Sequence, residues 1–119
     1  MSDENKTQTD LGFLGTFTGN DTARMRKYIT LFLGAAPAEA EAIRSALTTA
    51  DHEKVRASAH SLRPQMTYMG AKAGEELLKR MEEDVKAGKY DELQVTGAKF
   101  EAVFSKVCEE LQAYLKQIS

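Results

Sequence analysis

A chain of 119 residues has room for one domain with one hydrophobic core, and its 42% hydrophobic and 29% charged residues exclude a disordered polymer. The formal net charge of -2 gives no general attraction for nucleic acids, and the single cysteine, Cys108, excludes an intrachain disulfide. No apolar run is long enough for a membrane span or a signal peptide. We therefore expect a cytoplasmic protein, or a domain cut from one, that binds neither membranes nor nucleic acids. We also expect it to be a monomer.

The N-terminal segment is polar and carries no core-forming side chain over residues 1–9. It predicts a flexible tail ahead of one domain that spans residues 10–119. Leu11, Phe13 and Leu14 follow, and they predict a short turn that packs on the rest of the domain.

The next segment predicts two consecutive helices. Residues 18–21 read Thr-Gly-Asn-Asp, which supplies a break and an N-cap for a helix with a stripe of Met25, Tyr28, Ile29, Phe32 and Leu33. Gly34 weakens that helix near its end. Pro37 suits the first turn of a following helix that runs to about Thr49.

A third helix follows Asp51, which is a good N-cap, and it continues to about Met69 before Gly70 interrupts it. Its apolar positions recur at steps of four and three residues, which is typical of one buried face of an amphipathic helix: Val55, Ala59, Leu62, Met66 and Met69.

Two further helices complete the chain. One has apolar residues at steps of four, namely Ala73, Leu77, Met81 and Val85, and Gly88 is a natural residue to end it. Asp91 with Gln94 resembles a capping box at the start of the last helix. Short connections favour antiparallel neighbours, so the sequence predicts an all-α fold, an antiparallel up-down four-helix bundle with an additional N-terminal helix.

Several kinds of catalytic or metal site are excluded by spacing. A di-metal bundle needs Glu-x-x-His pairs, but Thr49 and Ala57 stand three residues before His52 and His60. One cysteine and two histidines are too few for structural zinc, and no glycine-rich phosphate loop is present. Cys108 lies on a largely apolar face, which favours a core thiol over a nucleophile. We expect no metal and no cofactor bound by this chain.

His60 is the remaining candidate. It lies one position off the apolar stripe of its helix, on a face that should meet water, and Arg56 and Arg63 share that face and could neutralise an anion. The small residues Ala57 and Ser61 flank it and leave room for another protein. A surface histidine without a task is the alternative, and it is our interpretation of His52, which has no such neighbours.

The segment Ala59-His60-Ser61-Leu62-Arg63, followed by Gly70-Ala71, resembles the motif of the histidine-containing phosphotransfer (HPt) family of multistep two-component signalling. The order and lengths of the predicted helices also resemble that family, over about residues 10 to 118. Gly70 matches the glycine of the motif, at the structural turn after the helix.

The resemblance implies a phosphorelay carrier. Its histidine, His60, would accept a phosphoryl group from a receiver-domain aspartyl phosphate and pass it to another receiver aspartate. Receiver domains and a hybrid sensor histidine kinase would be the partners, and the receiver would supply Mg²⁺. The chain would have no kinase activity and would bind no ATP. The alternative is a non-catalytic helical interaction module that uses the same face without phosphorylation.

The resemblance also assigns roles to neighbours of His60. Arg63 takes the place of the family's lysine and would offset the phosphoryl charge, and Glu82 falls where the family places a hydrogen-bond partner for the imidazole. An ordinary solvated side chain is the alternative for each. Arg56 is a supporting candidate because it shares the helix face of His60, and not because of the resemblance. The residues expected to face a docked partner are Ala57, Ser61, Pro64 and Thr67. Pro64 departs from the family pattern, which has glycine there; we expect the helix to continue through it with a bend.

Overall fold

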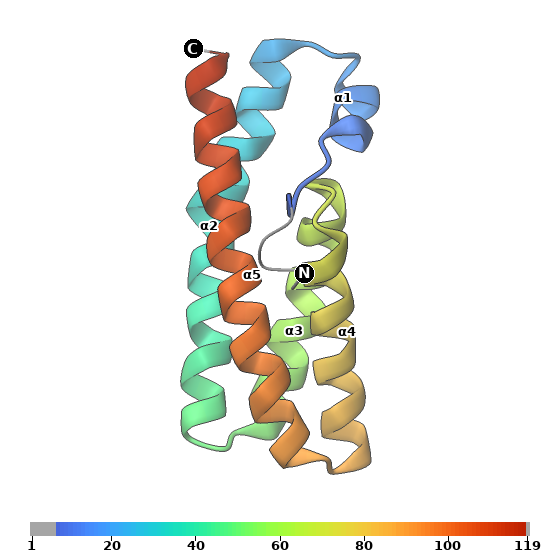
Figure 1. Cartoon of the computed structure of the whole chain (residues 1–119), viewed down its shortest axis with the longest axis vertical. Coiled ribbons are helices and arrows are strands. Elements are labelled where there is room, and N and C mark those ends of the chain that lie inside the picture. The colour runs from blue at the N-terminus through green and yellow to red at the C-terminus, as the bar shows by residue number, and fades with distance from the viewer. Residues whose placement is uncertain (1–6, 119) are drawn as a thin grey trace.

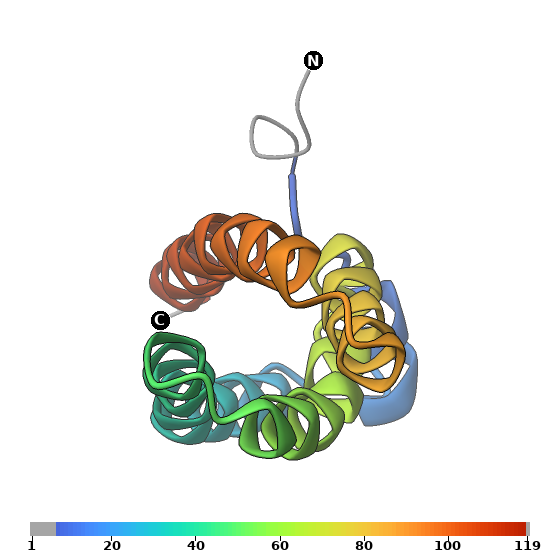
Figure 2. The same cartoon turned by 90° about the horizontal axis from the view of Figure 1, so that it is seen from below.

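The computed structural model describes residues 7–118, which form five helices and no strand. They are α1 (Gly12–Thr18), α2 (Thr22–Thr48), α3 (His52–Tyr68), α4 (Lys72–Ala87) and α5 (Tyr90–Gln117). Figures 1 and 2 show α2 to α5 side by side around a shared interior, with α1 outside this group. The predicted all-α bundle with an additional N-terminal helix is confirmed. Within residues 7–118, no helix is both long and apolar enough to cross a membrane.

The predicted break near Gly34 and Pro37 is wrong, because α2 is one helix of 27 residues with Pro37 inside it. Its buried side chains form one stripe that continues past the proline: Met25, Ile29, Phe32, Ala36, Ile43 and Ala46. Pro37 itself is exposed, so its ring takes no space from the core. Burial of the stripe on both sides of Pro37 therefore offsets the roughly 3 kcal/mol that an interior proline costs.

Helices α3 and α4 pack together and position most of the candidate site. The predicted stripe of α3 is confirmed, since all five of its members are buried. The predicted stripe of α4 is only partly right: Met81 is buried, but Leu78 rather than Leu77 is its fully buried leucine. Gly74 is buried on α4 as well, and it packs so closely against Met66 that a Cβ placed on it would come within 2.3 Å of Met66 Cε. A glycine gives no signal in an apolar pattern, so the sequence did not show that this part of α4 is buried.

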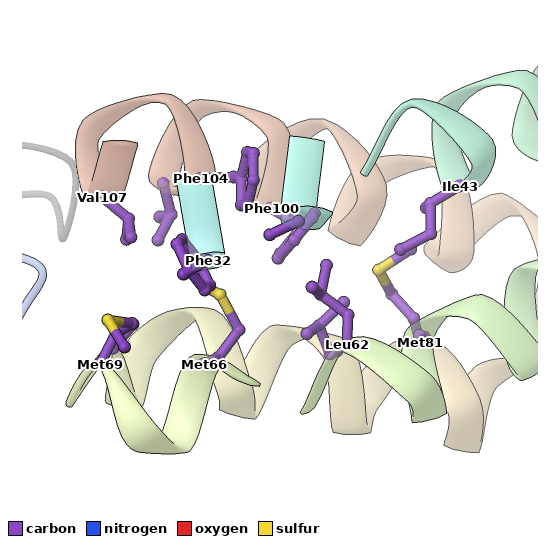
Figure 3. Close-up of a cluster of buried hydrophobic side chains, with 14 of the residues drawn as sticks. Phe32, Ile43, Leu62, Met66, Met69, Met81, Phe100, Phe104 and Val107 are labelled. Carbon is purple, nitrogen blue, oxygen red and sulfur yellow. The ribbon is translucent and has the colours of Figure 1, made fainter. Parts of the chain in front are cut away.

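The core is rich in methionine and phenylalanine and joins all four long helices. Figure 3 shows Met66 and Leu62 from α3 facing Phe32 from α2 and Phe100 from α5. Each such side chain stabilises the folded state by about 1.5–3 kcal/mol when it is fully buried. This packing holds α3 against its neighbours along the whole length of the helix. Pro64 lies inside α3 on the exposed face, and the helix continues past it.

The helix ends confirm three predictions and correct one. Asp21 and Asp51 cap α2 and α3 by accepting hydrogen bonds from the backbone N–H groups of Arg24 and Lys54. Gly88 ends α4 in the left-handed conformation. The predicted capping box at Asp91 is wrong, because α5 begins at Tyr90 without a side-chain cap. Gln94 instead donates a hydrogen bond from its amide to the carbonyl of Leu47.

The N-terminal segment differs from the prediction of a loose tail over residues 1–9. Residues 1–6 lie outside the described part of the chain, but Gln8 and Thr9 are held against α5 by Glu110. The predicted turn at Leu11 to Leu14 is a helix, α1. Leu14 is buried as expected, whereas Phe13 is 52% exposed.

Ala50 lies in the turn between α2 and α3 with φ of +56°, where a side chain is strained. We expect Ala50→Gly to stabilise the domain by up to about 1 kcal/mol, because glycine adopts this conformation without a steric penalty. Urea unfolding followed by circular dichroism measures the change. The matched control is Ala102→Gly at an exposed position inside α5, which should destabilise by about 0.5–1 kcal/mol. A loss of stability in both variants would contradict the prediction.

Candidate functional site

The imidazole of His60 stands on the outer face of α3 beside the seam with α4. Its side chain is 70% exposed, while its neighbours in the sequence, Ala59 and Leu62, are buried in the core. The position one step off the buried stripe therefore gives a histidine on a rigid helix with its ring in solvent. This agrees with the exposure predicted from the sequence.

Glu82 of α4 connects the imidazole to Arg63. One carboxylate oxygen, Oε1, lies 2.9 Å from His60 Nδ1, and the other, Oε2, lies 2.8 Å from Arg63 Nη1. The Glu82 side chain is only 11% exposed. A buried carboxylate needs partners for its charge, and here the two contacts provide them. The solvated alternative for Glu82 does not describe this geometry.

These contacts define which imidazole nitrogen is available. An ionised carboxylate accepts hydrogen bonds and donates none, so Nδ1 carries the proton that is shared with Glu82. In the neutral ring, Nε2 then holds the free electron pair. The exposed imidazole thus presents a nucleophilic nitrogen on the side away from Glu82.

Arg63 is held more tightly than a solvated arginine. Its side chain is 30% exposed, its Nη1 donates to Glu82, and its Nε is buried without a hydrogen-bond partner. In this structure its charge is directed at the carboxylate. Arg63 therefore fixes Glu82, which in turn fixes the imidazole.

Arg56 forms its hydrogen bonds outside this group. Its guanidinium donates to Glu53, one turn earlier on α3, and these hydrogen bonds lower the pKa of the Glu53 carboxyl. The hydrogen bonds to Glu53 raise the pKa of Arg56, and the charge of Glu82 raises it further, so Arg56 lies within electrostatic reach of the site. Its role in neutralising an anion at His60 stays a prediction.

The other candidate residues lie apart from His60. His52 stacks its ring on Tyr90 at the far end of α3, with the ring centroids 3.6 Å apart. Burial raises the pKa of the Cys108 thiol to about 11, which keeps the sulfur protonated and unreactive near neutral pH. Over residues 7–118, no group of three or more histidine, cysteine, aspartate or glutamate side chains is arranged to hold a metal ion.

The four residues that we expected to face a partner are all exposed: Ala57, Ser61, Pro64 and Thr67. The last two line a shallow hollow together with His60 and Arg63. This hollow also contains side chains that the sequence did not identify, from the short helix α1, the last turn of α3 and the first turn of α4. They are Phe13, Tyr68 and Glu75.

Comparison with known proteins identifies the family of this chain. The family model described as "Hpt domain" matches residues 27–119. The chain belongs to the Hpt domain family. Hpt domains are phosphotransfer carriers in two-component phosphorelays; they work with receiver and kinase partners and have no kinase activity of their own.

The fold of this Hpt domain is similar to a solved structure, the crystal structure of histidine-containing phosphotransfer protein B (HptB) from Pseudomonas aeruginosa PAO1. The TM-score is 0.83 at 18% sequence identity, and the match covers 92% of this chain and 96% of that chain. A comparison with curated proteins found no significant sequence match to this chain. At this identity the structural similarity shows the fold, and the site rests on the geometry above.

An apolar surface beside His60 is the feature that sequence reasoning missed in this Hpt domain. Phe13, Phe17, Leu31 and Tyr68 are large hydrophobic side chains that are each about half exposed. The three aromatic rings contact one another, with centroids 5.8 Å apart for Phe13 and Tyr68 and 6.2 Å for Phe17 and Tyr68. Phe13 and Phe17 are four residues apart, so they lie on the same face of a helix. The sequence analysis predicted a turn here, and for that reason it did not identify this face.

Proposed function

We propose that this Hpt domain carries a phosphoryl group between receiver domains on Nε2 of His60. One observation carries the proposal: an exposed imidazole is bound through Nδ1 to a buried carboxylate, which leaves Nε2 free and facing solvent. A structural histidine has no need of this combination, because its ring would be buried or would bind through both nitrogens.

The transfer step can be written from these contacts. The electron pair of Nε2 attacks the phosphorus of the receiver's aspartyl phosphate, the N–P bond forms, and the P–O bond to the aspartate breaks. The aspartate leaves as a carboxylate, and His60 becomes a phosphorylated imidazole that still carries its proton on Nδ1. Positive charge develops on the ring during the attack, and Glu82 lies 2.9 Å from Nδ1, where it stabilises that charge. The same steps in reverse deliver the group to a second receiver.

Receiver domains and a hybrid sensor histidine kinase are the partners in this proposal, and the receiver supplies the Mg²⁺ that neutralises the phosphoryl oxygens. The exposed apolar surface of Phe13, Phe17, Leu31 and Tyr68 supports docking of a protein next to His60, because exposed patches of this kind mark interaction sites. The small side chains at Ala57 and Ser61 leave the approach to the ring open.

The proposal is tested by mixing the purified domain with a panel of receivers phosphorylated on aspartate. The expected result is an acid-labile phosphate on the domain, localised to His60 by mass spectrometry at neutral pH, and its passage to a second receiver. Stable binding of receivers without any phosphate transfer would overturn the proposal and favour the interaction module.

We expect Glu82→Ala to slow transfer from a receiver about tenfold, since it removes a charge-assisted contact worth about 1.5–3 kcal/mol before solvent screening. Arg63→Ala should have a smaller effect, because Arg63 acts on the ring through Glu82. The matched control is Glu83→Ala, which removes an exposed carboxylate at the next position of α4.

The double variant separates two roles for Arg63. If Arg63 only positions Glu82, then Arg63→Ala adds no further loss in the Glu82→Ala background. Single-turnover transfer rates for the wild type, the two single variants and the double variant give the comparison. Additive losses would mean that Arg63 acts on the phosphoryl group itself, as the resemblance first implied.

A further inference from the structure

The segment ahead of α1 is bound to the bundle at two points that are far apart in the sequence. Glu110 of α5 accepts hydrogen bonds from the backbone N–H groups of Gln8, at 2.8 Å, and Thr9, at 2.9 Å, and from the Thr9 hydroxyl at 2.7 Å. Asp10 then donates its backbone N–H to the carbonyl of Gly70, in the turn between α3 and α4, at 3.1 Å. We call residues 8–10 the strap.

The strap passes very close to Gly70. That residue has φ of +63°, and a Cβ placed on it would lie 1.8 Å from the carbonyl oxygen of Asp10 and 2.6 Å from its carbonyl carbon. Gly70 thus serves two purposes, since it makes the turn and gives the strap its path across the turn.

Helix α1 depends on such anchors. It has seven residues, which is too short for a helix to be stable in water by itself, and only two of its side chains, Leu14 and Thr18, are buried. At its C-terminal end it is joined to α2 through Gly19, Asn20 and Asp21. At its N-terminal end Asp10 accepts a hydrogen bond from the Gly12 N–H, so the strap leads directly into its first turn.

The position of α1 matters because of what it carries. Phe13 lines the same hollow as His60 and Tyr68, and Phe17 packs on Tyr68 and on Tyr28 of α2. Without α1 the hollow would lose Phe13 and keep Tyr68, while His60, Glu82 and Arg63 would keep their contacts, which belong to α3 and α4 alone.

We propose that Glu110 is a positioning residue for receiver docking: it anchors the strap, the strap fixes α1, and α1 presents its aromatic side chains beside His60. The inference rests on the proposed function, because it assigns α1 to the surface that a receiver contacts. Glu110 touches neither the imidazole nor its partners, so its effect is on recognition and not on the chemical step.

The experiment compares Glu110→Ala, Glu110→Gln and the control Glu109→Ala, which removes an exposed carboxylate from the same turn of α5. Hydrogen exchange of the amides in residues 8–18 reports on the strap and α1. Steady-state transfer from a phosphorylated receiver gives KM and kcat. Labelling of His60 by phosphoramidate, a small donor that needs no docking surface, reports on the imidazole alone.

For Glu110→Ala we expect exchange at residues 8–18 to be at least about tenfold faster and KM for the receiver to rise about three- to tenfold, with kcat and phosphoramidate labelling unchanged. Glu110→Gln keeps an acceptor oxygen, so its KM should lie between those of the wild type and Glu110→Ala. Glu109→Ala should have the KM of the wild type. An unchanged KM, or unchanged exchange in α1, would overturn the inference while leaving the proposed function intact. A wild type that is labelled by phosphoramidate but by no receiver would overturn both.

Discussion

His60→Gln is expected to abolish phosphate uptake from every receiver and to leave the fold unchanged. Glutamine lacks the ring nitrogen that, in the proposed step, would form the N–P bond, and the side chain of His60 is 70% exposed, so its replacement opens no cavity in the core. The measurement is labelling of the variant by phosphorylated receivers, with far-UV circular dichroism and the thermal midpoint as checks on folding. Full labelling of the variant would move the acceptor to another residue.

The second histidine provides the matched control. His52 begins α3 and stacks on Tyr90, away from any carboxylate partner of the kind that Glu82 gives to His60. His52→Gln should therefore take up phosphate at the rate of the wild type. Labelling lost in His52→Gln but kept in His60→Gln would reverse the assignment of the two histidines.

Gly70→Ala is expected to have the largest effect on stability of the substitutions considered, at about 2–4 kcal/mol. Part of this cost is the left-handed backbone, with φ of +63°, which an alanine adopts with a penalty of about 1–2 kcal/mol. The rest comes from displacement of the strap, whose carbonyl oxygen at Asp10 would lie 1.8 Å from the new Cβ. Urea unfolding of the purified variant measures the total.

Gly88→Ala separates the two contributions. Gly88 has nearly the same backbone conformation, with φ of +70°, but no atom lies within 4 Å of a Cβ placed there. Gly88→Ala should lower the free energy of unfolding only by the cost of the left-handed backbone, about 1–2 kcal/mol. Equal losses in Gly70→Ala and Gly88→Ala would show that the strap moves aside freely and that its contact with Gly70 contributes nothing to stability.

The bundle and the exposed position of His60 were predictable because both follow from the period of the buried stripe in α3. All five apolar positions of that stripe are buried, and the position of His60, one step off it, is exposed, although Ser58, one step off it on the other side, is buried. The caps at Asp21 and Asp51 were predictable for a similar reason, since an N-cap depends on local sequence and backbone only.

Features that depend on contacts across the bundle were not predictable in this way. The stripe of α2 is buried on both sides of Pro37, and Gly74, which carries no apolar signal, packs against Met66 on the buried side of α4. Glu82 was placed beside His60 by resemblance, whereas periodicity left a solvated side chain equally possible. That Arg63 and His60 would share its two oxygens was not visible from spacing.

The N-terminal part of the site was missed for a related reason. A polar stretch such as residues 7–10 gives no apolar signal, and its order comes from Glu110, about a hundred residues later in the chain, as the sequence separation of 102 between Gln8 and Glu110 shows. Once that anchor is known, the four-residue spacing of Phe13 and Phe17 has an evident meaning as one face of α1.

The single outward-facing nitrogen has a kinetic consequence. If two receivers exchange the phosphoryl group on Nε2 of His60, as we propose, both would have to reach this nitrogen across the same face of α3. The two would then not occupy the domain together, and no ternary complex would form. Relay through this domain would then follow a double-displacement scheme, in which the first receiver departs before the second arrives. Each receiver would compete with the other for the free domain, so an excess of either slows the relay, and the flux depends on the ratio of the two receivers as well as on their phosphorylation.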